Sequence, residues 1–168
     1  ISKHGVVRKK MNLNQLQKDF REEVLKYKPG LIGFSVLEIT YDQGLELAKA
    51  IEDLSIPVIF GGIYPTFAPK IVLRESCIDM ICEGEGEEMF VELANNLENG
   101  KDITKILNLT VKKNGKIFRS GTEVRLNDLP TGDNIYGEKT GLRRSQTHMS
   151  KTLLAPDYSI YDERRFLK

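Results

Sequence analysis

The sequence predicts an α/β fold with a doubly wound parallel sheet, and two observations lead to this prediction. Short apolar runs alternate with amphipathic helical patterns along residues 13–100. Three of the runs are each followed by a glycine- or hydroxyl-rich stretch that leads into a helical pattern. In an open parallel sheet such loops lie together at the carboxyl ends of the strands, where α/β domains bind ligands. The same arrangement therefore predicts both a fold and the place of a binding site.

The first helix is expected over residues 13–27, where apolar side chains recur at helical spacing and Asn12 can cap the amino terminus. The apolar run 31–36 follows it. A near-continuous apolar run is typical of a parallel strand that is covered on both faces. Asp42 is the expected cap of a second helix. The buried face of that helix comprises Leu45, Ala48, Ile51 and Leu54.

Two further strands are expected at residues 57–60 and 78–82. Between them, Pro69 suits the first turn of a short helix. A longer helix follows the third strand and ends near Asn99, and its apolar face comprises Met89, Phe90, Leu93, Ala94 and Leu97. With right-handed crossovers, these elements form a flavodoxin-like (Rossmann-like) sheet with helices on both faces.

The pattern changes after residue 100. Residues 109–112 and 116–118 flank an Asn-Gly pair, which predicts a β-hairpin. From about residue 120 onward polar residues and glycines dominate, so an irregular tail or linker is expected. The chain is therefore expected to divide into an α/β domain at 1–119 and a tail at 120–168.

The expected sheet is thin, because three parallel strands are fewer than the roughly five of a doubly wound domain. The first helix also has no strand before it to pack on. We therefore expect an amino-terminal strand–helix–strand portion to be missing from this chain. Its absence would leave a sheet edge open and favour self-association.

Composition argues against several classes of protein. The net charge is +1 and the basic residues are spread along the chain, so no nucleic-acid partner is expected. No apolar stretch approaches the roughly 20 residues of a membrane span. Cys77 and Cys82 are expected to be buried thiols in a reducing, cytoplasmic compartment, and two cysteines are too few for a Cys-based metal or iron–sulfur site. His4 and His148 lie in polar segments and are expected to be solvated rather than catalytic.

The three loops offer small residues and hydroxyl groups, and for each a structural interpretation stays open beside a functional one. Gly61-Gly62 permits close approach of a large ligand, or serves a tight turn. Ser35, Thr40 and Thr66 can hydrogen-bond a ligand or their own backbone. The glutamates of the 83–88 segment stand where a helix dipole favours them, which argues against phosphate binding there. No nucleophile–base pair is visible, so any chemistry would come from a cofactor or another domain.

The order and spacing of these motifs resemble the cobalamin-binding domain of cobalamin-dependent radical S-adenosylmethionine enzymes. These include methyltransferases and the anaerobic magnesium-protoporphyrin monomethyl ester cyclase. The Ser-Val-Leu stretch at 35–37, followed by Gly61-Gly62, is similar to the S-x-L … G-G pair of cobalamin-binding domains. The stretches 57–66 and 83–88 look more narrowly like the radical-enzyme group. The resemblance covers roughly residues 13–119 and the last dozen.

The resemblance implies that the loops border cobalamin, with its nucleotide tail passing between them. It also implies that the corrin faces a radical S-adenosylmethionine domain in cis, which would hold the 4Fe-4S cluster and S-adenosylmethionine. This chain would then be one module of a methyltransferase or cyclase. The residues implied to bind the cofactor are Ser35, Leu37, Thr40, Gly61, Gly62, Tyr64, Pro65, Thr66, Gly84, Glu85 and Gly86.

Two motifs of the family are absent from the chain. The D-x-H-x-x-G motif, whose His ligates cobalt in the classical fold, is not found, and its expected place falls in the portion expected to be missing. The C-x-x-x-C-x-x-C cluster motif is absent too, so this chain is not expected to perform radical chemistry by itself.

Two alternative functions stay open. A cofactor-free flavodoxin-like regulatory or interaction domain would show a phosphoacceptor Asp at a strand end, but Asp79 lies at the start of its strand. A small enzyme acting on a nucleotide or sugar would need a general base among the loops, where only the dipole-favoured glutamates are available.

Overall fold

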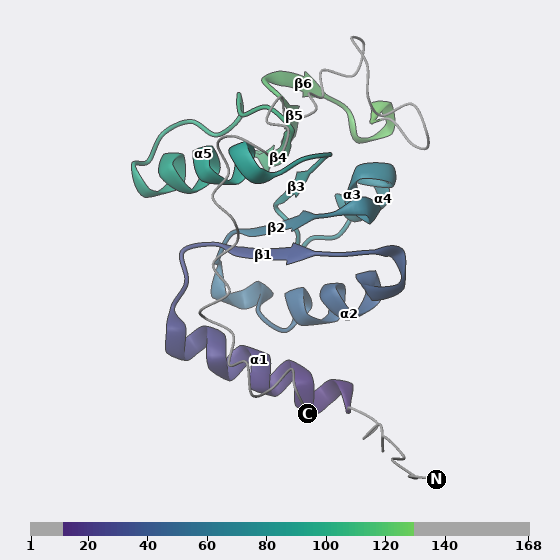
Figure 1. Ribbon diagram of the computed structural model, residues 1–168, viewed down its shortest axis with the longest axis vertical. Coiled ribbons are helices and arrows are strands. Elements are labelled where there is room, and N and C mark those ends of the chain that lie inside the picture. Colours follow the sequence, from purple (N-terminus) through teal and green to yellow (C-terminus); the bar gives the residue numbers. More distant parts are fainter. Residues whose placement is uncertain (1–11, 130–168) are drawn as a thin grey trace, which may run out of the picture.

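The computed structural model describes residues 12–129, which form a six-stranded sheet with helices on both faces (Figure 1). The strands are β1 (Ile32–Ser35), β2 (Val58–Gly61), β3 (Met80–Cys82), β4 (Leu109–Lys113), β5 (Lys116–Arg119) and β6 (Thr122–Val124). The α-helices are α1 (Leu13–Tyr27), α2 (Glu38–Lys49), α3 (Ile63–Phe67), α4 (Pro69–Val72) and α5 (Glu87–Glu98). Two 3₁₀ turns, η1 (Glu52–Leu54) and η2 (Leu126–Asp128), complete the described elements. His4, His148 and the tail beyond residue 129 lie outside the described residues.

The sheet runs in the order β1-β2-β3-β4-β5-β6. Strands β1, β2 and β3 are parallel, with Phe34 opposite Phe60 and Phe60 opposite Ile81, so the predicted fold class is confirmed. The predicted hairpin β4–β5 is also confirmed. It continues the same sheet, because β4 pairs antiparallel with β3 and places Leu109 opposite Cys82.

Strand β6 corrects the expectation of an irregular chain from residue 120. Ser120 and Gly121 have φ angles of 46° and 90°, so they form a two-residue turn that folds β6 back onto β5. Turns with both φ angles positive match the twist of paired strands. The Asn114-Gly115 turn, with φ angles of 53° and 73°, has the same character and was recognised because Asn-Gly is a stronger hairpin signal.

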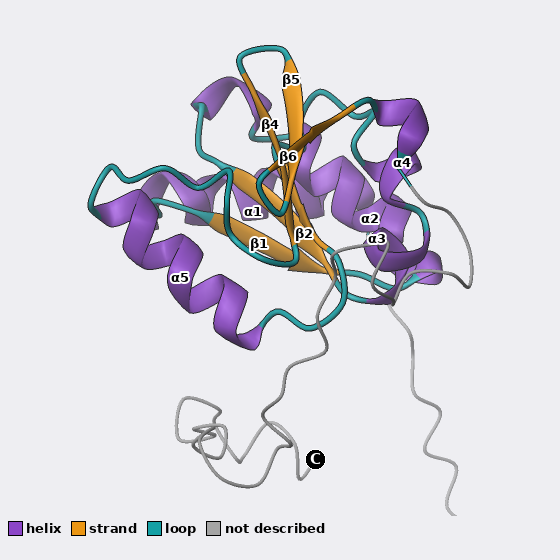
Figure 2. Ribbon diagram, turned by 90° about the horizontal axis from the view of Figure 1, so that it is seen from above, coloured by secondary structure: helices purple, strands orange, loops and turns teal. Residues whose placement is uncertain are grey.

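Side chains alternate between two cores, one on each face of the sheet. Viewed from above, α5 lies on one face and α2, α3 and α4 lie on the other (Figure 2). Phe60 and Ile81 belong to the core under α2, whereas Ile59, Met80 and Leu109 belong to the core under α5. This alternation decides which strand residues can reach a ligand bound against α5.

Helix α2 begins earlier than predicted. It starts at Glu38 rather than after Asp42, because the Thr40 hydroxyl accepts a hydrogen bond from the Leu37 N–H at 2.9 Å and caps the chain there. The helix ends at Lys49. The predicted core residues beyond that point are still packed, Ile51 at 1% exposure and Leu54 in the following 3₁₀ turn.

Other sequence predictions have mixed outcomes. Helix α1 and its cap are confirmed, because the Asn12 side chain accepts a hydrogen bond from Asn14 N. Cys77 and Cys82 are buried free thiols, as predicted. In α5, however, Ala94 is exposed and is not part of the buried face. Helix α3 occupies a segment that was expected to be a loop.

The outer edge of β1 has no strand partner within residues 12–129, since β1 pairs only with β2 there. Self-association through this edge stays a prediction. Within the same residues, every helix is too short or too polar to cross a bilayer.

The two sides of α5 give a test of the core. Leu93 is fully buried, whereas Val91 is 62% exposed on the same helix. Leu93→Ala should lower the free energy of unfolding by about 2–5 kcal/mol, because it leaves a cavity in the core under α5. Val91→Ala should change it by less than about 0.5 kcal/mol. Urea unfolding followed by circular dichroism measures both, and equal effects would contradict the assignment of faces.

Candidate functional site

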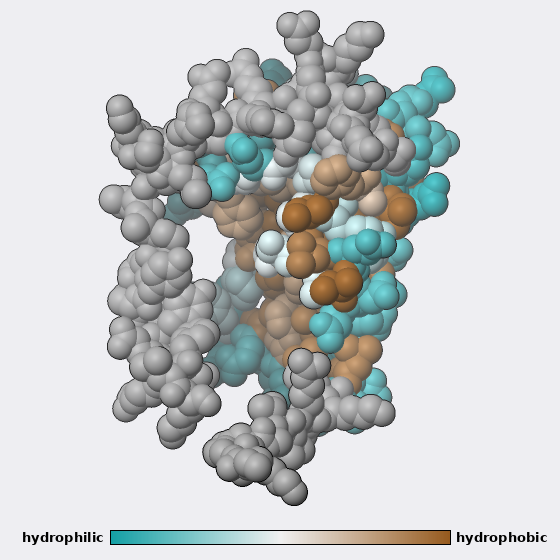
Figure 3. Space-filling view, turned by 45° about the vertical axis from the view of Figure 1, so that its right-hand side comes forward, coloured by the Kyte–Doolittle hydropathy of each residue, from teal (hydrophilic) through white to brown (hydrophobic). Residues whose placement is uncertain are grey.

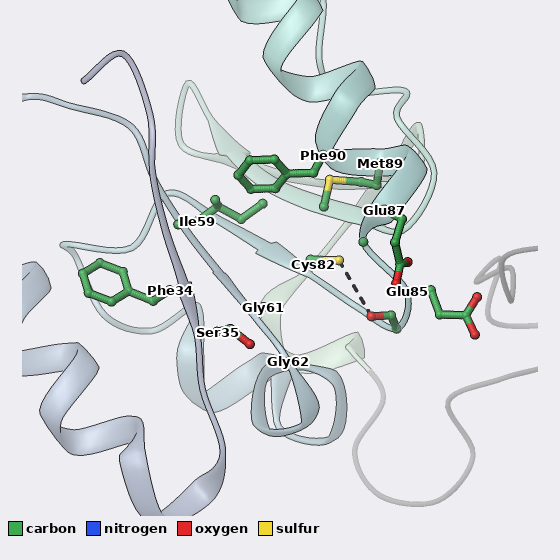
Figure 4. Close-up of a pocket in the computed structure, with 13 residues that line it drawn as sticks. Phe34, Ser35, Ile59, Gly61, Gly62, Cys82, Glu85, Glu87, Met89 and Phe90 are labelled. Carbon is green, nitrogen blue, oxygen red and sulfur yellow. Dashed lines mark hydrogen bonds between the residues drawn. The ribbon is translucent and has the colours of Figure 1, made fainter. Parts of the chain in front are cut away.

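The carboxyl ends of β1, β2 and β3 and the first turns of α5 border a cavity of about 550 Å³ (Figure 4). Six of the predicted site residues line it: Ser35, Gly61, Gly62, Gly84, Glu85 and Gly86. The convergence of the three loops at one edge of the sheet is thus present in the structure.

The cavity exists because glycine occupies strand positions that face α5. Alternation places Gly33 and Ser35 of β1 on the same face as Gly61 of β2 and Cys82 of β3. A Cβ added at Gly33 would lie 3.3 Å from Cζ of Phe90, so the Phe90 ring lies directly over the bare backbone. A side chain at Gly61 would enter the cavity, whereas a side chain at Gly33 would displace the Phe90 ring. Gly33 and Phe90 were not among the predicted site residues.

Gly62 has a structural role of its own. Its φ is +96°, and an added Cβ would lie 2.7 Å from the carbonyl oxygen of Val36. Val36 also donates its N–H to the Gly61 carbonyl at 2.9 Å, and its carbonyl accepts from Tyr64 N at 3.3 Å. The loops after β1 and β2 therefore touch through their backbones, which only glycine at position 62 allows.

Thr66 joins the second loop to the third. Its hydroxyl donates to the Gly62 carbonyl at 2.8 Å and accepts from the Gly84 N–H at 2.9 Å. The side chain is only 4% exposed and does not line the cavity. Thr66 therefore sets the relative positions of the two loops, and Thr40, which caps α2, is likewise engaged with backbone.

Three other predicted residues also lie outside the cavity lining. Leu37 is 47% exposed just before α2. Tyr64 packs its ring on Tyr41 with the centroids 4.6 Å apart, and Pro65 is buried in α3. These residues therefore shape the edge of the sheet rather than the wall of the cavity.

Glu83 was missed as a distinct residue by the sequence analysis. It is fully buried, and its carboxylate forms an ion pair with Arg119 on β5, with Nη2 and Oε2 2.9 Å apart. The Thr110 hydroxyl donates to the same carboxylate. No local pattern links partners that stand 36 residues apart in the chain. Glu87 and Glu88 do lie in the first turn of α5, as predicted.

The titratable side chains in the cavity lining are the Cys82 thiol and the carboxylates of Glu85 and Glu87. Burial raises the pKa of the Cys82 thiol to about 12, so the thiol is neutral near pH 7. Its sulfur lies 3.9 Å from the Gly84 carbonyl oxygen. Between residues 12 and 129 no group of three or more His, Cys, Asp or Glu side chains could hold a metal ion.

Comparison with known proteins identifies a domain family to which the chain is similar. Residues 2–94 match the family model described as B12 binding domain. An uncharacterised methyltransferase of Pyrococcus horikoshii is 32% identical over 102 residues, which are 59% of this chain and 22% of that protein. The anaerobic magnesium-protoporphyrin IX monomethyl ester cyclase of Rubrivivax gelatinosus is 31% identical over 93 residues, which are 52% of this chain and 17% of the cyclase. The chain thus spans about a fifth of the length of these relatives.

Solved structures show the same fold. The radical S-adenosylmethionine methyltransferase TsrM from Kitasatospora setae, solved with cobalamin and a [4Fe-4S] cluster, matches with a TM-score of 0.57 at 22% identity, over 64% of this chain and 21% of TsrM. The cobalamin-dependent radical enzyme OxsB, solved with aqua-cobalamin, matches with a TM-score of 0.50 at 19% identity, over 68% of this chain and 16% of OxsB.

Substitution of Gly62 tests the close approach of the first two loops. Gly62→Ala should lower the free energy of unfolding by at least about 1–3 kcal/mol, because alanine is strained at positive φ and its Cβ meets the Val36 carbonyl. Gly61→Ala is the matched control, since its Cβ would make only an ordinary 3.5 Å contact with Cys82. Urea unfolding measures both variants. Similar losses at the two positions would contradict this account.

The buried thiol gives a test by pH. An unfolded cysteine titrates near a pKa of about 8.5, so above that pH the unfolded chain loses its proton before the folded one. The unfolding free energy should therefore fall as pH rises from about 8.5 toward 12, and less steeply in Cys82→Ala.

Iodoacetamide at pH 8.5 should label Cys82 slowly in folded protein and quickly in urea, as followed by peptide mass spectrometry. Equal labelling rates would show that the thiol is not buried.

Proposed function

This chain belongs to the B12-binding domain family, and from that premise we propose that it holds cobalamin at the cavity between β1, β2, β3 and α5. The observation that supports this most directly is the missing side chain at Gly61, which leaves a slot between the sheet and α5, while Gly33 lets the Phe90 ring close one end of the slot. A slot of this kind suits an elongated group that enters from the carboxyl edge of the sheet.

The apolar part of the slot fits the flat base of the nucleotide tail of cobalamin, and the phosphate of the tail would lie away from Glu85 and Glu87, which also line the slot. A volume of about 550 Å³ lies within the usual range of small-molecule sites. Ile59, Met89 and Phe90 form an apolar wall for the flat base of the tail. Glycine at positions 61, 62, 84 and 86 lets the tail approach the backbone closely, and the Ser35 hydroxyl offers a polar contact.

Exposed apolar side chains form a rim beside the carboxyl ends of β1 and β2. Leu37 and Ile39 at the start of α2 are 47% and 87% exposed, and Ile63 and Phe67 of α3 are 61% and 42% exposed. Figure 3 brings forward the side to which β1 points, and hydrophobic residues gather on its surface there. Exposed apolar patches mark ligand or partner contacts. We place the corrin over this rim, where a second domain would meet it.

Cobalamin, when bound, supplies cobalt chemistry such as methyl transfer. Residues 12–129 contain no histidine, so within this part the protein offers no imidazole to the cobalt. The role of the chain is to hold the tail and to orient the corrin.

The larger protein is proposed to be a cobalamin-dependent radical S-adenosylmethionine enzyme, either a methyltransferase or a cyclase. The 4Fe-4S cluster and S-adenosylmethionine would belong to a separate domain in cis, because the chain covers only about a fifth of its relatives. Two buried free thiols support a reducing, cytoplasmic compartment. The division at residue 119 stays a prediction, and β6 lies directly beyond it.

The alternative function, a cofactor-free regulatory domain, is weakened by the position of Asp79. Its Oδ2 accepts a hydrogen bond from the Val58 N–H at 2.8 Å, at the amino ends of the strands. The carboxylate therefore joins β2 to the start of β3, away from the edge where a phosphoacceptor would stand.

Titration of the full chain with hydroxocobalamin tests the proposal. We expect a shift of the corrin absorbance and co-elution of protein and corrin on gel filtration. Gly61→Val should weaken binding at least tenfold, because the valine methyl groups enter the slot while its backbone suits a strand. Gly30→Ala is the control, since its added Cβ has no atom within 4 Å. Absence of binding at 100-micromolar protein, or equal affinities of the two variants, would overturn the proposal.

A further inference from the structure

We propose that the buried Glu83–Arg119 ion pair is a positioning device for the binding site, which holds the loop of residues 84–86 in the shape that admits the ligand. The inference rests on the proposed cobalamin function. Neither side chain lines the cavity, so the pair acts through the loop and not by touching the ligand.

The ion pair is well formed and almost sealed from water. The Glu83 side chain is fully buried and the Arg119 side chain is 10% exposed. Nε of Arg119 lies 2.9 Å from Oε1 of Glu83, and Nη2 lies 2.9 Å from Oε2, which is the two-pronged geometry of a guanidinium–carboxylate pair. The Thr110 hydroxyl donates to Oε1 as well. The carboxylate therefore has one strongly preferred position.

Asn108, which directly precedes β4, also holds the loop through hydrogen bonds. The Glu83 N–H donates to the Asn108 carbonyl at 2.9 Å, and Nδ2 of Asn108 donates to the Glu85 carbonyl at 3.0 Å. The Asn108 N–H in turn donates to the Ser120 hydroxyl oxygen at 3.1 Å. Residues on both sides of Gly84 are thus held by β4, β5 and the connections that flank them.

The loop needs such external restraint because two of its three residues are glycine. Gly84 has a φ of +86°, and glycine visits both signs of φ at little cost. The loop sequence alone does not select the conformation that lines the cavity. Thr66 holds it from α3, and the hairpin holds it from the opposite side.

A buried ion pair is a costly way to gain stability alone. Well-packed apolar residues commonly stabilise a core as well or better, whereas removal of one partner leaves an unpaired buried charge. Because Glu83 directly precedes Gly84, we infer that the ion pair fixes the conformation of the loop of residues 84–86. That role predicts that stability and ligand affinity can be separated by mutation.

The test compares Arg119→Met with the double variant Glu83→Gln/Arg119→Met. The single variant leaves the Glu83 carboxylate unpaired, so it should lose both stability and affinity for hydroxocobalamin. The double variant removes both charges and should recover most of the lost stability. If the pair positions the loop, its affinity stays at least tenfold weaker than that of the unmodified chain. If the role is only structural, affinity recovers together with stability, and the proposal is overturned.

Two further variants complete the series, with all affinities measured at a temperature where circular dichroism shows the chain folded. Lys113→Ala removes a hairpin ion pair with Asp102 that does not reach the loop, and it should leave affinity unchanged. Arg119→Lys keeps the charge without the two-pronged geometry and should give an intermediate affinity. If Arg119→Lys bound hydroxocobalamin as weakly as Arg119→Met, the two-pronged hydrogen bonding would not explain the effect on affinity.

Hydrogen–deuterium exchange of the ligand-free chain separates this inference from the cobalamin proposal. In the double variant, amides of residues 84–86 should exchange at least tenfold faster, whereas those of α2 should keep their protection. Unchanged exchange at the loop would overturn the positioning role. If the unmodified chain binds no cobalamin, the proposed function fails, and this exchange result still decides whether the ion pair holds the loop.

Discussion

The site depends on one constraint, which is the alternation of side chains along three short parallel strands. Because successive residues face opposite sides, the positions that face α5 near the carboxyl ends of β1 and β2 are Gly33, Ser35, Ile59 and Gly61. Two of these four positions have no side chain. The opposite face bears Phe34 and Phe60, whose rings lie 4.8 Å apart and pack against the core under α2. The same strands therefore bear large side chains on the face toward α2 and border the cavity on the face toward α5.

The loops around this opening hold one another in place. Val36 is bonded to backbone on both sides of Gly62, Thr66 bridges Gly62 and Gly84, and the hairpin holds Glu83. Backbone and hydroxyl groups that sequence motifs suggest as ligand donors are thus partly engaged with neighbouring loops. This arrangement agrees with a pre-formed pocket, in which a few polar groups contact the ligand and the others form hydrogen bonds that fix the positions of the loops.

The sequence predicted those elements whose determining residues lie within or next to the element itself. Parallel strands, the helix α1 cap and the Asn-Gly hairpin were predicted because apolar runs and turn residues lie next to what they determine. The sequence could not decide whether Thr66 faces a ligand or a neighbouring loop, since its partner Gly84 is 18 residues away. Likewise Glu83 looked like one more helix-end glutamate until the structure paired it with Arg119.

The contacts of Glu83 with the β4–β5 hairpin bear on where the cobalamin-binding domain ends in the sequence. The family match stops at residue 94, yet Thr110 and Arg119, which hold Glu83, stand beyond it. A piece cut at that boundary would keep all three loops but would end inside α5, and it would leave the Glu83 carboxylate beside Gly84 without Thr110 and Arg119. During synthesis, too, Thr66 would hold the third loop before Arg119 on β5 could pair with Glu83, because Arg119 is made 36 residues later.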